Sequence, residues 1–465
     1  MASTGIKVLA GEKFNIFILI FYIVVMVAVS PLIPEVSLFK LGDFTRDTIN
    51  YYHTVMIPLA LLLIIYASFV LKLPKKISRI ISVSTVPLLI LNIVGLVLFY
   101  PVATQGADYI IQGARDVWML GIAFLFFLGL LVVPFRDKAR FKKIWGAYLL
   151  VVFSTVSAGA ATIMGMIYEY GYLYGFGTIP LFNSFMNSIG GTSSFLVNLL
   201  TSHSHEMLPA IMGGIVALAL IGFGYENLTK GKRRLVNIGM VVSMIGTVGM
   251  TYIYIISSFS TYSIPTLFTS GSGGMNGLAF DDFLTGLIGV GALISVVGIY
   301  FVLSRKKSIK LIQVAELLVW VATVFVMIGI GYIIEFNEVY YGFGSPGAPP
   351  NGGAGYIYDM AYMNAHLVFA FFLMPVLAGL LLGFLLFIKR DSRYVNFSAY
   401  LFFAGILLSA DGVLVYLVTL SWYVEAAGVA LTTAAMVLML YITANNYRNA
   451  DVVSGHNKRL SNKRH

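Results

Sequence analysis

Long apolar runs recur along the whole chain, and they limit the possible folds more than any other feature. Each run holds about 20 residues, which as a helix is long enough to cross the roughly 30 Å hydrocarbon core of a bilayer. The alternating pattern of membrane β-strands is missing, so helices are the expected spanning elements. Twelve spans are expected, near residues 14–34, 51–72, 78–100, 117–134, 145–167, 204–224, 235–258, 283–304, 311–334, 361–388, 396–420 and 422–444.

The composition supports an integral membrane protein. Hydrophobic residues make up 59% of the 465 residues and charged residues 11%, whereas soluble domains have about 45–50% apolar and about 25% charged residues. A soluble enzyme, a disordered chain and a fibre are thereby excluded. The chain has no Cys, which excludes disulfides, iron–sulfur clusters and covalently attached c-type haem. We expect one polytopic all-α membrane domain over residues 1–465, embedded in the lipid bilayer.

The basic residues predict the orientation of the chain. The net charge is +10, and all but three of the 30 Lys and Arg residues fall before the first span, in the connections after every second span, or in the tail 445–465. The exceptions are Lys40, Arg46 and Arg115. The positive-inside rule then places both termini in the cytoplasm, in a multi-pass plasma-membrane protein. We interpret the basic surplus as a topology signal, with anionic lipid contact as a second use, and expect no nucleic-acid partner.

The expected outer connections are long and rich in Tyr and Gly. They include YEYGYLYGFGTIP, SGSGGMNG and GFGSPGAPPNGGAG. Two interpretations stay open: ordinary surface loops, or a docking surface for an external cytochrome or another respiratory subunit.

Four of the six histidines share one position relative to the expected spans. His456 and His465 lie in the tail, whereas the other four lie at the outer ends of the second, sixth and tenth spans, each with a Pro several residues further in. These four are His53, His203, His205 and His366. A single His at a helix end is usually an interfacial polar residue, but four at matched depth favour a cavity or a cofactor. The repeated interval suggests three four-helix arcs about a pseudo-threefold axis.

The spacing of His203 and His205 favours haem over a single shared metal ion. Two residues apart on a helix, their side chains point about 200° from each other. The pair is therefore suited to two separate interhelical spaces, with His53 and His366 supplying the opposite ligands. Four imidazoles would hold two haems, and without Cys these must be non-covalent, hence haems b or a close relative.

The arrangement resembles subunit I of the heme-copper oxidase and nitric oxide reductase superfamily. The likeness rests on twelve spans, both ends inside, and the second- and tenth-span segments YYHTVMIP and NAHLVFAFFLMPVLAG. It implies that His53 and His366 ligate a low-spin haem. The chain departs from the family at Asn364, where the family has His, and in the seventh span, which has no His. Copper and oxygen reduction by this chain are therefore not expected. The chain also resembles the hydrophobic subunit of the cytochrome b complex of thermoacidophilic archaea.

Two haem pairings are compatible with the sequence. In one, His53 and His366 hold the family's low-spin haem, and the sixth span holds another group. In the other, His53 pairs with one sixth-span His and His366 with the other. The second pairing is favoured because it uses all four residues.

Four further polar residues are candidates for supporting roles. Glu206 could orient a ligand imidazole or carry protons, with interfacial solvation as the alternative. Asp411, inside the eleventh span, is a candidate for proton relay or quinol contact, or a buried acid satisfied by its neighbours. Arg46 and Arg115 lie at span ends on the haem side and are candidate partners of haem propionates; their alternative partners are Asp47 and Asp116.

The sequence therefore predicts an electron-transfer subunit of a respiratory complex. It would carry two haems b near the outer face and pass electrons between quinol and an external acceptor or partner cytochrome. A secondary transporter with twelve helices is the main alternative, and a divergent terminal oxidase is a third. A transporter would not explain four histidines at one depth.

Overall fold

The part of the chain that the structure describes is all-helical. It is a computed structural model that describes residues 10–29, 44–99, 105–174, 192–259, 280–303, 393–419 and 421–461, and these contain no β-strand. Seven of the described helices are long and apolar enough to cross a membrane, and three more have shorter apolar segments. The expected class, an all-α membrane protein, is confirmed.

The described helices coincide with ten of the twelve expected spans. They are α1 (Ala10–Val29), α3 (Phe44–Val70), α4 (Lys75–Phe99), α5 (Gln105–Arg136), α6 (Lys138–Tyr174), α8 (Thr192–Phe223), the short 3₁₀ helix η2 (Tyr225–Asn227), α9 (Lys230–Ser258), α10 (Phe280–Leu303), α14 (Arg393–Thr419) and α15 (Tyr423–Ser461). The expected spans 311–334 and 361–388 lie outside the described residues. The total of twelve spans and the pseudo-threefold arrangement therefore stay predictions.

Helices α3 and α8 are the inner helices of the described bundle, and every residue from 210 to 221 of α8 is buried. In the apolar segment of α3, 83% of the residues are buried, compared with 28% in those of α4 and α5. Helix α8 contacts α3, α6, α9 and α10. The peripheral helices expose large apolar side chains such as Val83, Ile90 and Phe124, as expected for surfaces that face lipid tails. A residue on α3 or α8 is thus well placed for an internal site.

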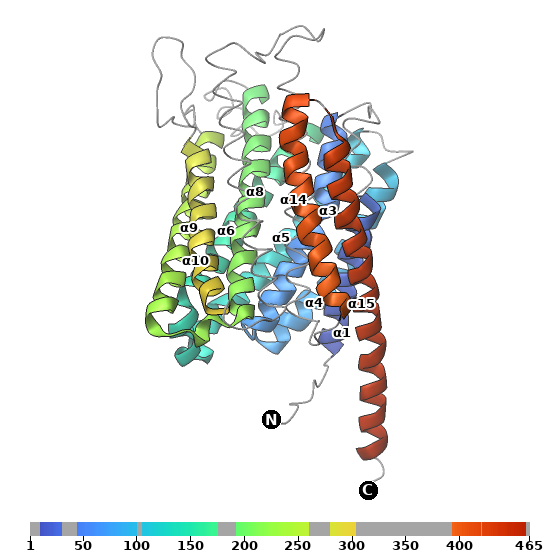
Figure 1. Ribbon diagram of the computed structural model, residues 1–465. Helices are drawn as coiled ribbons and strands as arrows, with labels where there is room; N and C mark the ends of the chain where they lie inside the picture. The colour runs from blue at the N-terminus through green and yellow to red at the C-terminus, as the bar shows by residue number, and fades with distance from the viewer. Residues whose placement is uncertain are drawn as a thin grey trace.

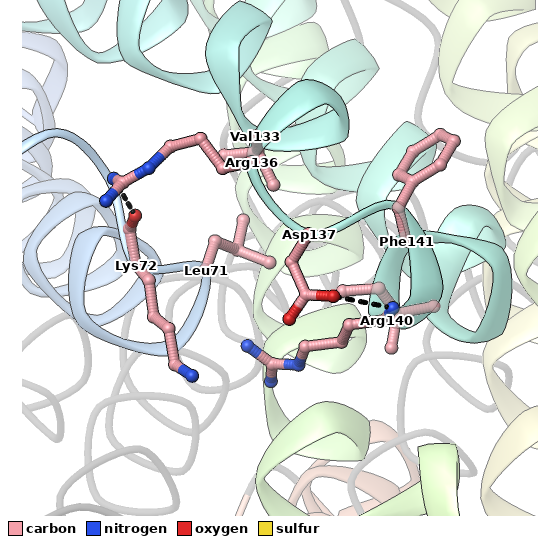
Figure 2. Close-up of a pocket in the computed structure, with 8 residues that line it drawn as sticks. Leu71, Lys72, Val133, Arg136, Asp137, Arg140 and Phe141 are labelled. Atoms are coloured by element: carbon pink, nitrogen blue, oxygen red, sulfur yellow. Dashed lines mark hydrogen bonds between the residues drawn. The ribbon is translucent and has the colours of Figure 1, made fainter.

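Three connections meet at one end of the bundle, which we call the basic end: residues 71–74, residue 137 and residues 224–229. Arg136 Nη1 donates to the carbonyl of Lys72 at 2.7 Å, and Arg140 Nη1 donates to that of Val70 at 2.7 Å. Arg140 also binds Glu226, with 2.9 Å between Nε and Oε2. Figure 2 shows residues that line a pocket of about 240 Å³ at this end, among them Lys72, Arg136 and Arg140. Arg140 therefore joins α6 to the ends of both inner helices.

Two helices extend past the expected spans. Helix α6 continues to Tyr174, although residues from 168 onward were expected to form an outer loop; the segment has no Pro, and its buried Glu169 belongs to the helix. Helix α15 continues to Ser461 and projects beyond the bundle (Figure 1), so most of the expected tail 445–465 is helical. Hydropathy marks the part of a helix that lies in lipid, and it does not mark where the helix ends.

Replacing Arg140 with Ala is expected to destabilise the protein. The change removes two hydrogen bonds of a charged, largely buried group, and we expect a loss of about 2 kcal/mol. A lower thermal unfolding midpoint of the detergent-solubilised protein would show it. Lys143→Ala, at an exposed position on the same helix, is the control and should stay within about 0.5 kcal/mol. Equal effects of the two changes would contradict this role of Arg140.

Candidate functional site

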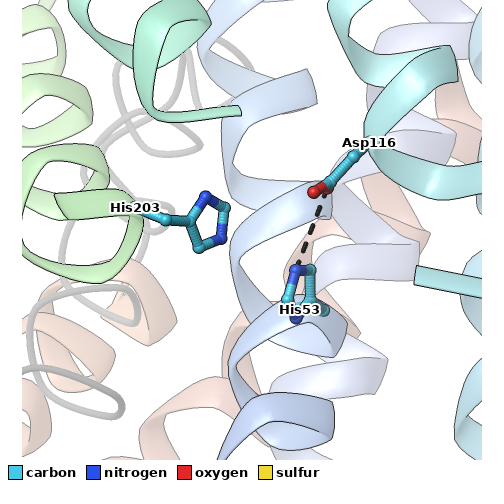
Figure 3. Close-up of side chains that lie close together, drawn as sticks. All are labelled: His53, Asp116 and His203. Atoms are coloured by element: carbon cyan, nitrogen blue, oxygen red, sulfur yellow. Dashed lines mark ion pairs between the residues drawn. The ribbon is translucent and has the colours of Figure 1, made fainter. Parts of the chain in front are cut away.

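His53, Asp116 and His203 come together inside the bundle (Figure 3). They belong to α3, α5 and α8, and each is at most 7% exposed. One possible metal-ligating atom from each residue lies within 4.8 Å of the other two. Among the described residues, this is the one group of at least three His or acidic side chains that is arranged to hold a metal ion.

The two imidazole rings are stacked and nearly parallel. Their centroids are 5.8 Å apart and their planes differ by 17°. Asp116 Oδ1 lies 3.9 Å from His53 Nε2. The structure thus brings together one histidine of the second expected span and one of the sixth, as in the pairing that shares the sixth span.

All three residues lie at a similar depth in the bundle. His53 precedes the basic end of α3 by 17 residues, and Asp116 and His203 precede those of α5 and α8 by 20 residues each. At the helical rise, these separations are about 26–30 Å. Because the hydrocarbon core is about 30 Å thick, the group lies close to the membrane surface opposite the basic end.

Helix α6 fixes the orientation of the His203 ring. His203 Nδ1 is 2.7 Å from the carbonyl oxygen of Ala161, which can only accept, so Nδ1 carries the proton and donates it. His203 Nε2 is buried and has no hydrogen-bond partner among the described residues. A Cβ at Gly165 would come within 2.6 Å of His203 Nδ1, so only Gly lets α6 approach this closely. The arrangement leaves Nε2 as a free lone pair, as in ligating histidines.

Pro58 helps to place Arg115 in the same region. Proline has no N–H, so the Thr54 carbonyl, four residues earlier in α3, lacks its usual helical partner. Asn92 Nδ2 of α4 donates to that carbonyl at 3.1 Å, and Asn92 Oδ1 accepts from Arg115 Nη1 at 3.3 Å. A Cβ at Gly95 would come within 2.8 Å of the Arg115 guanidinium. The local sequence of α3 and α4 thus provides both a hydrogen bond and space for Arg115.

Arg115 belongs to a buried group of charges around the two imidazoles. It is fully buried, and Asp116 and Glu169 are 3% and 4% exposed. Glu169 interacts electrostatically with both Asp116 and Arg115, and its Oε2 lies 3.0 Å from where a Cβ of Gly113 would be. Ionisable groups at membrane depth are costly and usually mark a functional site.

Glu206 lies one helical turn after His203 and is 1% exposed. Its side chain is close to Thr251 of α9, and Thr251 is hydrogen bonded to Ser157 of α6. The interfacial solvation considered for Glu206 is therefore wrong. Its burial is compatible with the orienting or proton-carrying role.

The remaining candidates are only partly covered by the structure. Arg46 and His205 lie in α3 and α8, but their side chains are outside what is described; His366 lies wholly outside the described residues. Asp411 lies in α14 and is exposed, so it is not a buried acid, and its role in proton relay or quinol contact stays a prediction. Because α8 is continuous from Thr192 to Phe223, the helical geometry assumed for His203 and His205 is confirmed.

Sequence reasoning missed Asp116 and Glu169 as members of the site. The expected fourth span began at residue 117 and the expected fifth span ended at 167, so both acids fell just outside the expected spans. Helices α5 and α6 include them. Two signals for their burial were available in the sequence. Asp116 directly follows Arg115, and Glu169 lies in a Tyr-rich segment that no Pro interrupts.

The donor set is suitable for a metal centre, and Asp116 distinguishes between two kinds. Two imidazoles from packed helices would be able to hold haem iron through their ring nitrogens. Two imidazoles and one carboxylate suit a single transition-metal ion. One Asp116 carboxylate oxygen lies within 4.8 Å of a possible ligating atom of each imidazole. It would therefore bind a single ion directly, whereas a haem would use the imidazoles alone.

Gly165→Ala should disturb the site, whereas Gly159→Ala on the same helix should not. The first Cβ would collide with the His203 ring, at an expected cost of about 1–3 kcal/mol. The second would meet no atom within 4 Å, and Ala is the better helix former by about 0.5–1 kcal/mol. Thermal unfolding in detergent measures both. A Gly165→Ala protein as stable as the control would mean that α6 does not hold the ring.

Comparison with known proteins adds no family to this geometry. No protein-family model matches the chain, and neither a curated protein nor a solved structure is significantly similar to it.

Proposed function

We propose that the protein is a membrane-bound b-type cytochrome that acts as the electron-transfer subunit of a respiratory complex. The observation that carries the proposal is the buried pair His53 and His203, which face each other from the two inner helices. His203 contributes an unpartnered Nε2 within the described part of the site. Through their ring nitrogens these two imidazoles would hold one haem iron, which would provide a one-electron couple within the membrane.

The surrounding residues support this function through their charge and hydrogen bonds. Ala161 fixes the tautomer and orientation of His203. Arg115, held by Asn92, would place a positive charge beside haem propionates. Burial and the hydrogen bond to the ring nitrogen are the means by which this chain would set the potential.

The further parts of the proposal follow from the sequence. His205 and His366 would hold a second haem b on the opposite side of α8. The positive-inside rule places the basic end in the cytoplasm of a plasma-membrane protein, and hence the His53–His203 site near the outer face. Quinol as donor and an external cytochrome as acceptor, docked on the Tyr- and Gly-rich loops, complete the proposed path.

Asp116 favours a second candidate, a single transition-metal ion held by His53, Asp116 and His203. Its carboxylate already lies among the possible ligating atoms. Such a centre would be a buried metal site without porphyrin, and it would not absorb as a haem does.

Alanine at His53 or His203 should abolish one haem signal. Each change removes an axial imidazole, and we expect the reduced-minus-oxidised spectrum of the purified protein to lose the low-spin band of that haem. His456→Ala, remote in α15, is the control and should leave the spectrum unchanged. If the unmodified protein contains no haem, or if both variants keep the full signal, the cytochrome proposal is wrong.

Asp116→Asn separates the two metal centres. For a haem, the amide leaves both imidazole ligands in place, so haem content per chain should be kept. For a single ion, the lost carboxylate should lower the metal content by at least about tenfold, the usual order for a disturbed metal site. Haem assay and elemental metal analysis of the same preparation provide the two measurements.

A further inference from the structure

A groove lies between α6 and α9 at the basic end, away from the imidazole site. It has a volume of about 380 Å³. Four cationic side chains line it, together with one polar and four apolar side chains; its lining consists of Lys142, Trp145, Lys230, Arg233, Arg234, Asn237, Ile238, Val241 and Val242. No acidic residue is among them.

The charges of this groove differ from those of the neighbouring pocket at the same end. In that pocket Arg136 and Arg140 are bound to carbonyls and to Glu226. In the groove, Lys142, Lys230 and Arg234 are exposed, and none has a side-chain hydrogen bond or ion pair to any described residue. Arg233 donates to the Leu228 carbonyl at 3.2 Å. The groove therefore holds positive charge that the described protein does not neutralise.

The backbone adds to this positive charge. Helix α9 begins at Lys230, and its N-cap Thr229 makes no side-chain capping hydrogen bond. The first N–H groups of a helix lack partners within the helix and attract anions. This helix start lies beside the cations of the groove.

Charge and apolarity are ordered along the groove as they are in a phospholipid. The cations occupy the first turn of α9 and the start of α6. Trp145 and Ile238, which are 37% and 47% exposed, lie further into the bilayer with Val241 and Val242. A Cβ at Gly146 would come within 2.8 Å of Asn237 Oδ1, so the two helices approach closely beneath the groove.

We propose that this groove is a binding site for an anionic phospholipid. Its phosphate would lie among Lys142, Lys230 and Arg234, and its acyl chains would lie along Trp145 and Ile238. Basic pockets between membrane helices on the cytoplasmic side are suited to anionic headgroups. The proposal does not depend on which metal the imidazole site holds.

The test compares two double variants of the full-length protein in detergent. Lys142→Gln with Arg234→Gln removes two groove cations, whereas Lys76→Gln with Arg79→Gln removes one exposed Lys and one exposed Arg from α4 at the same end. Binding of spin-labelled phosphatidylglycerol is measured for each. We expect about a thirtyfold loss of affinity in the groove variant, about fivefold per charge, and little change in the control.

Two further measurements identify the ligand. Phosphatidylcholine should bind much more weakly than phosphatidylglycerol. Trp145→Ala should weaken lipid binding while leaving competition by inorganic phosphate unchanged. Any one of three results would overturn the proposal. These are equal losses of affinity in both double variants, equal binding of the two lipids, and complete displacement of the lipid by millimolar phosphate.

Discussion

The buried charges between α3, α5 and α6 constrain the rest of the described structure. Taking an ion out of water costs several kcal/mol even after the protein has relaxed around it, and Arg115 is fully buried. The neighbouring residues offset this desolvation cost by giving Arg115 a hydrogen-bond partner and space. Pro58 frees a carbonyl for Asn92, Asn92 binds Arg115, and Gly95 leaves room for the guanidinium. These features lie on three helices, so the charges also set how the helices pack.

The sequence was sufficient to predict the described apolar helices but not the complete site. Ten expected spans match described helices because a bilayer imposes a length and a hydropathy that any spanning segment must show. The matched depth of His53 and His203 was predictable for the same reason. Asp116 and Glu169 were missed because hydropathy falls at charged residues whether they face water or the interior of a bundle. Only the packing of α5 and α6 distinguishes these environments.

Asp116 is the member of the candidate site that separates the two proposed metal centres. His53 and His203 are compatible with both candidates, since imidazole ligates haem iron and free transition metals alike. Asp116 differs from them because a carboxylate oxygen is a ligand for a bare transition-metal ion, whereas the proposed haem would use the imidazoles alone. A direct role of this carboxylate in metal binding is therefore the expected difference between a mononuclear site and an electron-transfer haem.

Helix α6 connects the two ends of the molecule. Near one membrane surface it fixes His203 through Ala161 and Gly165, and near the other it contributes Lys142 and Trp145 to the basic groove. Lys142 and Ala161 are 19 residues apart, or about 29 Å along the helix. A rigid helix transmits any axial displacement over that length, and the contact between Gly146 and Asn237 leaves little space for sliding against α9.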